Sequence, residues 1–376
     1  MSDSKLSLWS FTTVKDEEDI IESFVRYHMN FLDGMVISDN LSNDNTLSIL
    51  KRLKKEGYNI DILEDKNRRF DQVKTRNNLL KYTIKKHEPD VIFPIDADEF
   101  ICSKDGGSPR RVIKKLTSGP VYSYRMHTYV LPVKYPKEKF LPSKFALVRK
   151  EGEYEQKDYK CFITKDAYNK NISLMMGSHG IIYNNKSEYG LETDLLYLAH
   201  FPVRSKSQLM NKVIIGRINN MALHSREEGL GFHQYNILDG IIATGTIPDD
   251  ILIKESEHYN LKDNKEKIET YTQKFRIDFC NNIEPQYSSH NNNLSILSNT
   301  IRAAESCLNY LRNELNRTRD DNANQKQQLE KIERDNESLK QSLLSTKQEL
   351  ESIYKSKRWI LSSKIAKIVH PSNKTK

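Results

Sequence analysis

The segment Val91-Ile-Phe-Pro-Ile-Asp96-Ala-Asp98-Glu-Phe100 joins an apolar run to two aspartates one residue apart. The apolar part predicts a buried strand, so that both carboxylates lie at the end of a sheet. Hard divalent cations such as Mn²⁺ and Mg²⁺ prefer oxygen ligands and keep open positions for phosphate oxygens. The segment therefore predicts a metal site at Asp96 and Asp98. The alternative is a pair of turn or helix-capping aspartates.

Strands and helices alternate before this segment. Hydrophobic patterning predicts strands at residues 6–14, 35–38 and 60–63, and helices at 17–32, about 45–56 and 72–86. Such alternation is typical of an α/β fold with a largely parallel sheet flanked by helices. Ligands of these sheets lie beyond the carboxyl ends of the strands, so the candidate site residues are Lys15 to Glu17, Asp39, and Asp96 to Glu99.

The pattern changes after residue 120. Residues 121–182 favour shorter β-type runs, 195–200 a further strand, and 207–223 a helix. Residues 260–300 are polar, and 286–293 are typical of a flexible linker. We therefore predict an α/β domain at 1–260, a helical or polar linker at 261–299, a coiled coil at 300–355 and a basic amphipathic tail at 356–376.

The predicted coiled coil depends on an unbroken spacing of three and four residues. The heptad positions are Ile301, Ala304, Leu308, Leu311, Leu315, Thr318, Asn322, Gln325, Leu329, Ile332, Asn336, Leu339, Leu343, Thr346, Leu350 and Ile353. Asn322 and Asn336 at a positions favour a parallel dimer, whereas Leu329 at a with Ile332 at d favours a trimer or tetramer. The alternative is a single solvated helix, which would expose the whole apolar seam.

Composition limits the location and the partners. The four cysteines, at 102, 161, 280 and 307, form no CxxC pair, which favours reduced thiols and a cytoplasmic protein. The N-terminus lacks a signal-type apolar stretch. The net charge of +8 is partly carried by the tail, and no nucleic-acid-binding signature accompanies it. Anionic lipid headgroups or phosphorylated substrates fit the charge at least as well.

Five ordered motifs resemble those of glycosyltransferase family 2-like proteins, over roughly residues 5–240. They are Val14-Lys-Asp-Glu-Glu-Asp19, Arg26-Tyr27-His28, Ile37-Ser-Asp39-Asn-Leu-Ser42-Asn-Asp44-Asn-Thr46, Thr75-Arg76-Asn77 and Asp96-Ala-Asp98-Glu-Phe100. The subgroup most similar carries a Tyr-His pair on its first helix. The resemblance implies a GT-A fold, with a mixed, mainly parallel sheet, and a nucleotide-diphosphate sugar as donor.

The resemblance also implies roles for single residues. Asp39 contacts the base or ribose, Ser42 and Asp44 shape the adjoining turn, and Asp96 and Asp98 serve the sugar-phosphate and the metal. Lys15, Glu17 and Arg76 lie in the same motifs and are predicted to bind the donor. Leu41 departs from the family, which usually has Gly or another small turn residue there.

Two later histidines complete the predicted site. His200, in His200-Phe-Pro-Val-Arg204-Ser205, resembles a late family motif and is predicted to bind the metal, with Arg204 on a donor phosphate. His179 lies beside glycines and is predicted to be the general base, with Glu192, Asp194 and Glu99 as rivals. The alternative for both histidines is a hydrogen-bonded core position. That alternative is the prediction for His28.

The predicted function is transfer of a sugar to a glycan or lipid-linked acceptor in bacterial surface-polysaccharide synthesis, with inversion, at the cytoplasmic membrane face. The basic amphipathic stretch 358–369 contains Trp359 and is typical of peripheral contact with an anionic membrane, although a partner-binding or disordered tail fits equally. A nucleotidyltransferase on a related sheet is one alternative, but no Gly-rich phosphate loop is found near the N-terminus. An inactive coiled-coil scaffold is another, and the intact Asp96 and Asp98 argue against it.

Overall fold

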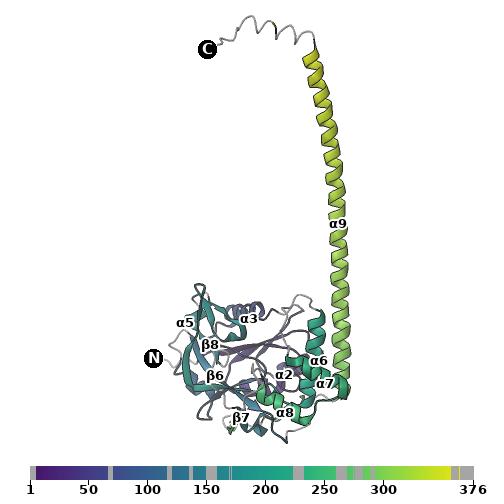
Figure 1. Cartoon of the computed structure of the whole chain (residues 1–376). Helices are drawn as coiled ribbons and strands as arrows, with labels where there is room; N and C mark the ends of the chain where they lie inside the picture. Colours follow the sequence, from purple (N-terminus) through teal and green to yellow (C-terminus); the bar gives the residue numbers. More distant parts are fainter. Residues whose placement is uncertain are drawn as a thin grey trace, which may run out of the picture. The chain divides into compact units, whose positions relative to one another are not determined.

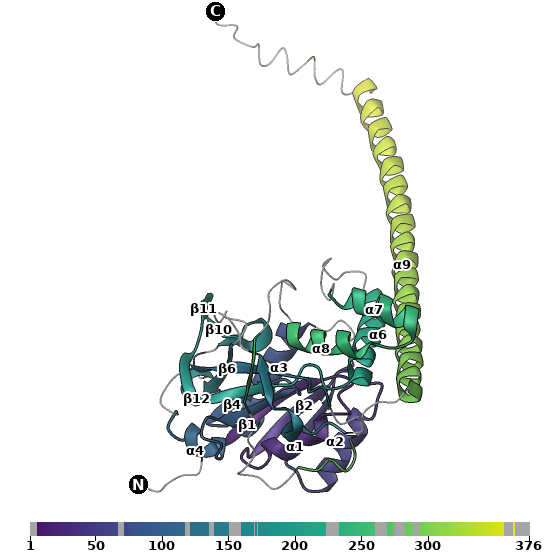
Figure 2. The same cartoon turned by 60° about the horizontal axis from the view of Figure 1, so that its bottom comes forward.

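The computed structural model divides into two compact units, Met1–Cys307 and Leu308–Lys376. The residues it describes are 6–66, 71–116, 121–134, 139–149, 159–168, 170, 172–222, 233–259, 269–273, 275, 283–288, 293–356 and 364. The first unit is a mixed sheet with helices on its faces, and the second consists of the later part of one long helix (Figures 1 and 2). The predicted α/β architecture with a C-terminal helix is confirmed.

Four parallel strands in the order β4-β1-β2-β3 form the N-terminal half of the sheet. They are β1 (Leu8–Val14), β2 (Gly34–Asp39), β3 (Ile60–Glu64) and β4 (Val91–Pro94). Alternate side chains of these strands enter two different hydrophobic clusters, because successive strand residues point to opposite faces. On β1, for example, Leu8 lies in one cluster and Trp9 in the other. Burial on both faces explains why β4 is apolar throughout and why even Ser10 and Thr12 of β1 are buried, whereas the edge strand β3 is only partly buried.

Helices cover both faces of this half. Helices α1 (Ile21–His28) and α2 (Thr46–Lys55) contribute to one cluster, and α3 (Gln72–His87) contributes Leu79 and Leu80 to the other. The three helices confirm the predicted ones, but α1 is shorter than the predicted 17–32. Its first predicted residues instead form a polar loop at the carboxyl end of β1.

Among the described residues, six further strands extend the sheet with mixed pairing, whereas β9 (Ser173–Leu174), β10 (Ile181–Tyr183) and β11 (Lys186–Glu188) form a separate three-stranded antiparallel sheet. Strand β12 (Leu191–His200) runs parallel to β6 (Val121–Val130) and antiparallel to β5 (Glu99–Ser103), while β8 (Tyr159–Thr164) lies between β6 and β4. The other elements are α4 (Pro109–Ile113), β7 (Leu147–Arg149), α5 (Lys165–Tyr168), α6 (Lys206–Ala222), α7 (His233–Thr244), α8 (Asp249–His258) and β13 (Thr270–Thr272). The strand predicted at 195–200 and the helix at 207–223 are confirmed as β12 and α6.

Helix α9 (Asn293–Lys355) begins earlier than the predicted coiled coil. Ile296, Ala303 and Cys307 are buried, so its first turns belong to the core of the first unit. The backbone N–H groups of Gln286, Tyr287 and Ser288 donate to the buried carboxylate of Glu22 at 2.6–2.8 Å. This part of the predicted linker is therefore held against α1. Residues 289–292 lie outside the described part of the chain.

The later part of α9 forms the second unit and carries the predicted heptads. Its large apolar side chains are exposed, among them Leu315, Leu329, Ile332, Leu339, Leu343, Leu350 and Ile353. The helix is confirmed, and its association into a coiled coil stays a prediction. Apart from Ser356 and Lys364, the basic tail lies outside the described residues.

The remaining sequence expectations concern thiols and membrane segments. Cys102, Cys161 and Cys307 are buried and not disulfide-bonded, whereas Cys280 lies outside the described residues. Among the helices that the structure describes, none has the length and apolar character needed to cross a bilayer.

Candidate functional site

Three loops meet at one edge of the sheet, where the parallel strands β1, β2 and β4 end. They follow Val14, Asp39 and Pro94, and each carries predicted site residues. Because parallel strands end on the same side, residues far apart in the sequence converge here. The fourth contribution is the end of β12, where His200 pairs with Glu99 across the antiparallel β5–β12 ladder.

Hydrogen bonds join the loops after β1 and β2. The Ser42 hydroxyl accepts from the Asp16 backbone N–H at 2.9 Å, and Asp44 Oδ2 accepts from that of Glu18 at 3.0 Å. The Lys15 ammonium donates to two backbone carbonyls of the second loop, those of Asn40 and Leu41. Lys15, Ser42 and Asp44 are thus brought together, and they hold the shape of the loops. Their contact with a donor stays a prediction.

Asp39 is the last residue of β2, and one oxygen of its carboxylate lacks a hydrogen-bond partner among the described residues. The side chain is 4% exposed, and Oδ2 accepts from the Ser42 N–H at 3.2 Å. Oδ1 is buried and has no hydrogen-bond partner among the described residues. Burial also raises the pKa of Asp39 above its usual range. A buried carboxylate oxygen without a partner is costly, and a ligand that donates a hydrogen bond would relieve this cost.

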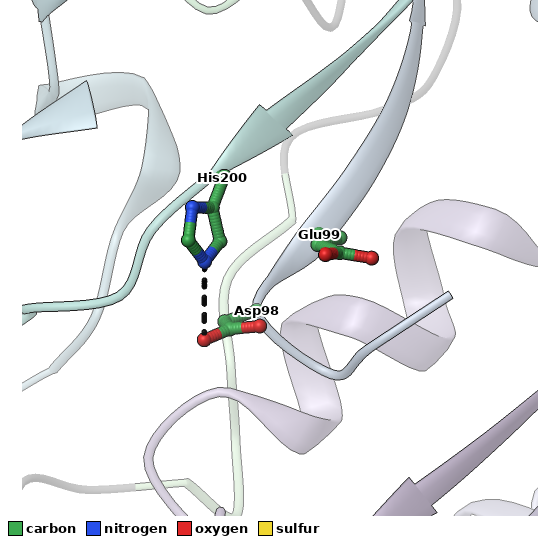
Figure 3. A group of neighbouring side chains, drawn as sticks. All are labelled: Asp98, Glu99 and His200. Atoms are coloured by element: carbon green, nitrogen blue, oxygen red, sulfur yellow. Dashed lines mark ion pairs between the residues drawn. The ribbon is translucent and has the colours of Figure 1, made fainter. Parts of the chain in front are cut away.

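Three side chains that could bind a metal ion come together where β4 leads into β5. Asp98, Glu99 and His200 are all buried, and one ligand atom of each lies within 4.8 Å of the others. Figure 3 shows the His200 ring directed at the Asp98 carboxylate, with Nε2 3.6 Å from Oδ2. The other ring nitrogen, Nδ1, lies 3.4 Å from the Thr128 hydroxyl, which fixes the orientation of the ring. The sequence had predicted Asp98 and His200, but not Glu99, as ligands.

The remaining predicted ligand, Asp96, faces fixed cations. Arg76 Nη2 donates to its Oδ1 at 2.9 Å, and Lys160 Nζ donates to its Oδ2 at 2.5 Å. Burial opposes ionisation, but Arg76 and Lys160 outweigh it and lower the pKa of Asp96 to about 2. The link between Arg76 and Asp96 joins two of the predicted motifs. Metal binding by Asp96 stays a prediction.

Arg204 is enclosed by carboxylates. It is 1% exposed, and its guanidinium donates to both oxygens of Asp19 and to Glu17 at 2.6–2.9 Å. Burial raises the pKa of Glu17 to about 7, although Arg204 opposes this shift. Arg204 thus fixes the loop after β1, and a direct phosphate contact by it stays a prediction.

One cation of α6, Lys212, was not anticipated from the sequence. Lys212 donates to the Tyr259 hydroxyl at 3.3 Å, and the Tyr259 ring lies 5.7 Å from the His200 ring. Burial opposes its charge, but Tyr259 and Asp98 outweigh the burial and raise the pKa of Lys212. A lysine inside an amphipathic helix gives no sequence signal for such a role.

His179 is oriented by a backbone carbonyl. Its Nδ1 lies 2.6 Å from the Tyr159 carbonyl oxygen, which can only accept, so Nδ1 carries the proton and Nε2 is the basic nitrogen. Tyr159 precedes Lys160, so the ring is anchored beside the Asp96 cluster. Burial lowers the pKa of His179, which keeps the ring neutral near pH 7.

The rival bases differ from His179 in their partners. Glu192 pairs with Arg125 at 2.7 Å, and Asp194 is largely exposed, with Lys104 at 3.5 Å. Glu99 is buried against Lys160 at 2.6 Å. Each rival is thus paired with a cation, and burial raises the pKa of Glu99 although Lys160 opposes this shift.

The chain is similar to several solved structures at low sequence identity. No family model matches the sequence, and no curated protein is similar to it. Among solved structures, the chain is similar to S. aureus TarS residues 1–349, with 13% identity, 68% of this chain and 75% of that chain covered, and a TM-score of 0.31. It is also similar to the mannosyltransferase PcManGT from Pyrobaculum calidifontis in complex with GDP-Man and Mn²⁺, with 10% identity, 81% and 88% coverage and a TM-score of 0.33. A third is GalNAc-T7 with UDP, GalNAc and Mn²⁺, with 10% identity, 69% and 60% coverage and a TM-score of 0.34. Such scores are too low to establish a shared fold, so the function rests on the side chains of this chain.

Proposed function

We propose that this protein is a metal-dependent glycosyltransferase with a GT-A fold, which transfers a sugar from a nucleotide-diphosphate sugar. The observation that carries the proposal is the buried Asp98–His200 pair at the edge where the parallel strands end. The unsatisfied carboxylate oxygen of Asp39 lies at the end of β2, at the same edge of the sheet and two strands from β4 in the order β4-β1-β2. A pair of metal-binding side chains and a hydrogen-bond acceptor for a nucleoside at one sheet edge are what a nucleotide-diphosphate donor requires.

The donor set suits Mn²⁺ or Mg²⁺. Carboxylate oxygen suits both ions, and an imidazole nitrogen favours Mn²⁺ of the two. Asp98 and His200 would hold the ion, and Glu99 is near enough to contribute. When bound, such an ion offsets the negative charge that develops on a diphosphate leaving group.

The nucleoside belongs at Asp39 in this proposal. Its buried Oδ1 accepts a hydrogen bond from a base N–H or a ribose hydroxyl, which removes the cost of the unsatisfied oxygen. The bonds between the loops after β1 and β2 hold the Asp39 carboxylate in place before the donor arrives. Binding then requires little reorganisation.

His179 is the proposed general base. Nε2 takes the proton of the acceptor hydroxyl, whose oxygen forms a bond to the anomeric carbon while the bond from that carbon to the diphosphate oxygen breaks. This single displacement inverts the configuration. The Tyr159 carbonyl holds the tautomer with a basic Nε2, and burial keeps the ring neutral at the working pH.

The finer part of the proposal concerns the acceptor and the assembly. The motif resemblance supports a glycan or lipid-linked acceptor in bacterial surface-polysaccharide synthesis, at the cytoplasmic face of the membrane. The exposed Leu and Ile side chains of α9 support self-association through a coiled coil, most simply as a parallel dimer. Grouped basic tails would then bind an anionic membrane more strongly than one tail alone.

A screen of nucleotide sugars by thermal unfolding, with and without Mn²⁺, tests the proposal. A bound donor stabilises the folded state by about 2.7 kcal/mol at one hundred times its Kd, which raises the melting temperature by several degrees. We expect this shift for at least one donor, only with metal, and not in Asp98→Asn. Asp250→Asn, at an exposed position of α8, serves as the matched control. A shift that persists without metal, or one that survives in Asp98→Asn, would refute the proposed site.

A further inference from the structure

Lys160 is a buried lysine in the middle of the site that the proposed function does not use. It lies on β8 and is 2% exposed. Its ammonium donates to Asp96 Oδ2 at 2.5 Å and to Glu99 Oε2 at 2.6 Å. A lysine between Tyr159 and Cys161 in an otherwise apolar strand is unusual, since burial of an unpaired ammonium is strongly unfavourable.

Lys160 and Arg76 together neutralise two of the three carboxylates in the acidic segment. Arg76, itself 1% exposed, binds the oxygen of Asp96 that Lys160 does not. Glu99 Oε2 also accepts from the Asp96 backbone N–H at 2.8 Å. Both oxygens of Asp96 and one of Glu99 are therefore occupied by groups that cannot leave for solvent.

Asp98 is different. Among the described residues its ion-pair partner is His200, at 3.6 Å, and no lysine or arginine lies at ion-pair distance. In the acidic segment, the charges of Asp96 and Glu99 are thus neutralised by buried cations, whereas the ion-pair partner of Asp98 is the imidazole of His200.

We propose that Lys160 is a built-in counter-ion that keeps a divalent cation off Asp96 and confines it to Asp98 and His200. A cation at Asp96 would have to displace an ammonium that is enclosed by protein. The Asp98 position alone supplies one full negative charge, and the nearby ammonium repels the cation. Metal binding therefore stays weak until the diphosphate of the donor adds oxygen ligands, so that metal and donor bind cooperatively. This inference rests on the proposed function.

Mn²⁺ titration of the full-length protein, followed by the electron paramagnetic resonance signal of free Mn²⁺, tests the inference without an activity assay. In the wild type, UDP or GDP should tighten Mn²⁺ binding by about tenfold or more. Lys160→Gln keeps a hydrogen-bond donor but removes the charge, and should tighten Mn²⁺ binding without nucleotide by a similar factor. Lys160→Arg keeps the charge and should behave as the wild type. Lys186→Gln, on the exposed strand β11, is the control.

The outcomes separate this inference from the proposed function. Failure of every nucleotide to bind with Mn²⁺ refutes both. Mn²⁺-dependent nucleotide binding with equal Mn²⁺ affinity in Lys160→Gln and wild type refutes only the role of Lys160. If Lys160→Gln does not fold, the wild type alone decides, because tight Mn²⁺ binding that nucleotide does not strengthen would overturn the inference.

Discussion

The buried side chain of His28 should make the stability of the first unit depend on pH, and its contacts allow the size of this dependence to be worked out. The side chain is 0% exposed and lies on α1 among aromatic rings, with the Phe24 centroid 4.5 Å and the Phe100 centroid 5.6 Å away. Nδ1 lies 2.8 Å from the Phe24 carbonyl oxygen, and Nε2 lies 3.3 Å from the Ile101 backbone N–H. The carbonyl requires a proton on Nδ1, and the amide requires a bare Nε2, so the ring is neutral.

The size of the effect follows from the pKa. Burial lowers the pKa of His28 from 6.5 to about 3, and the bond to Phe24 opposes this only in part. Below pH 6.5 the unfolded chain binds a proton that the folded chain does not, so the stability present above pH 6.5 is lost as the pH falls toward 3. The loss is about 1.4 kcal/mol per pH unit, which makes it about 1.4 kcal/mol at pH 5.5.

Urea unfolding of the full-length protein at about pH 7.5, 6.5 and 5.5 measures this loss. His28→Gln keeps a polar side chain without titration, so the difference between the two pH slopes isolates His28 from the other histidines. We expect the wild type to lose about 1.4 kcal/mol more than His28→Gln between pH 7.5 and 5.5. Equal losses would show that His28 is charged or solvated in the folded state, and the hydrogen-bond assignment would then be wrong.

Two further predictions concern catalysis and assembly. His179→Asn keeps a donor for the Tyr159 carbonyl but lacks the basic Nε2. Turnover should therefore fall by about 10²–10⁴-fold, while Mn²⁺-dependent donor binding, measured by calorimetry, stays unchanged. In the wild type the acid limb of the pH profile of kcat/KM should lie below pH 6.5, because burial lowers the pKa of His179. A chain that ends at Cys307 keeps the buried turns of α9. It should be monomeric by light scattering and should no longer sediment with anionic liposomes, whereas the full-length chain should be a dimer or larger. The same oligomeric state in both chains would exclude association through α9.

The edge of the sheet that carries the site could be predicted from the sequence, because the apolar pattern of a strand and the polar residues that end it are local features. Apolar runs that end in polar residues located the ends of β1, β2 and β4, and parallel pairing then required those ends to meet. The late His200 could be assigned only through resemblance. The structure adds the physical reason, since the β5–β12 ladder places His200 opposite Glu99.

Other features could not be predicted because they depend on side chains distant in sequence. The pairing of Arg204 with Asp19, and that of Lys160 with Asp96 and Glu99, joins segments that no local pattern relates. Strand β5 was missed because it is short and begins at the acidic segment. Helix α1 was predicted too long, since apolar spacing continues into a loop whose polar residues have partners on other elements.

The loop after β2 shows how the site keeps a conformation that the sequence disfavours. Leu41 has φ = 54°, in the left-handed region that costs an L-residue about 1–2 kcal/mol, which explains why a Gly or another small residue is more usual there. The strain persists because neighbouring hydrogen bonds hold the loop. Lys15 donates to the backbone carbonyls of Asn40 and Leu41, and Asp39 accepts from the Ser42 N–H. Strain that several polar contacts maintain beside an unsatisfied carboxylate oxygen is characteristic of a binding site. In the proposed function, these bonds therefore hold the loop in shape before a nucleoside reaches Asp39.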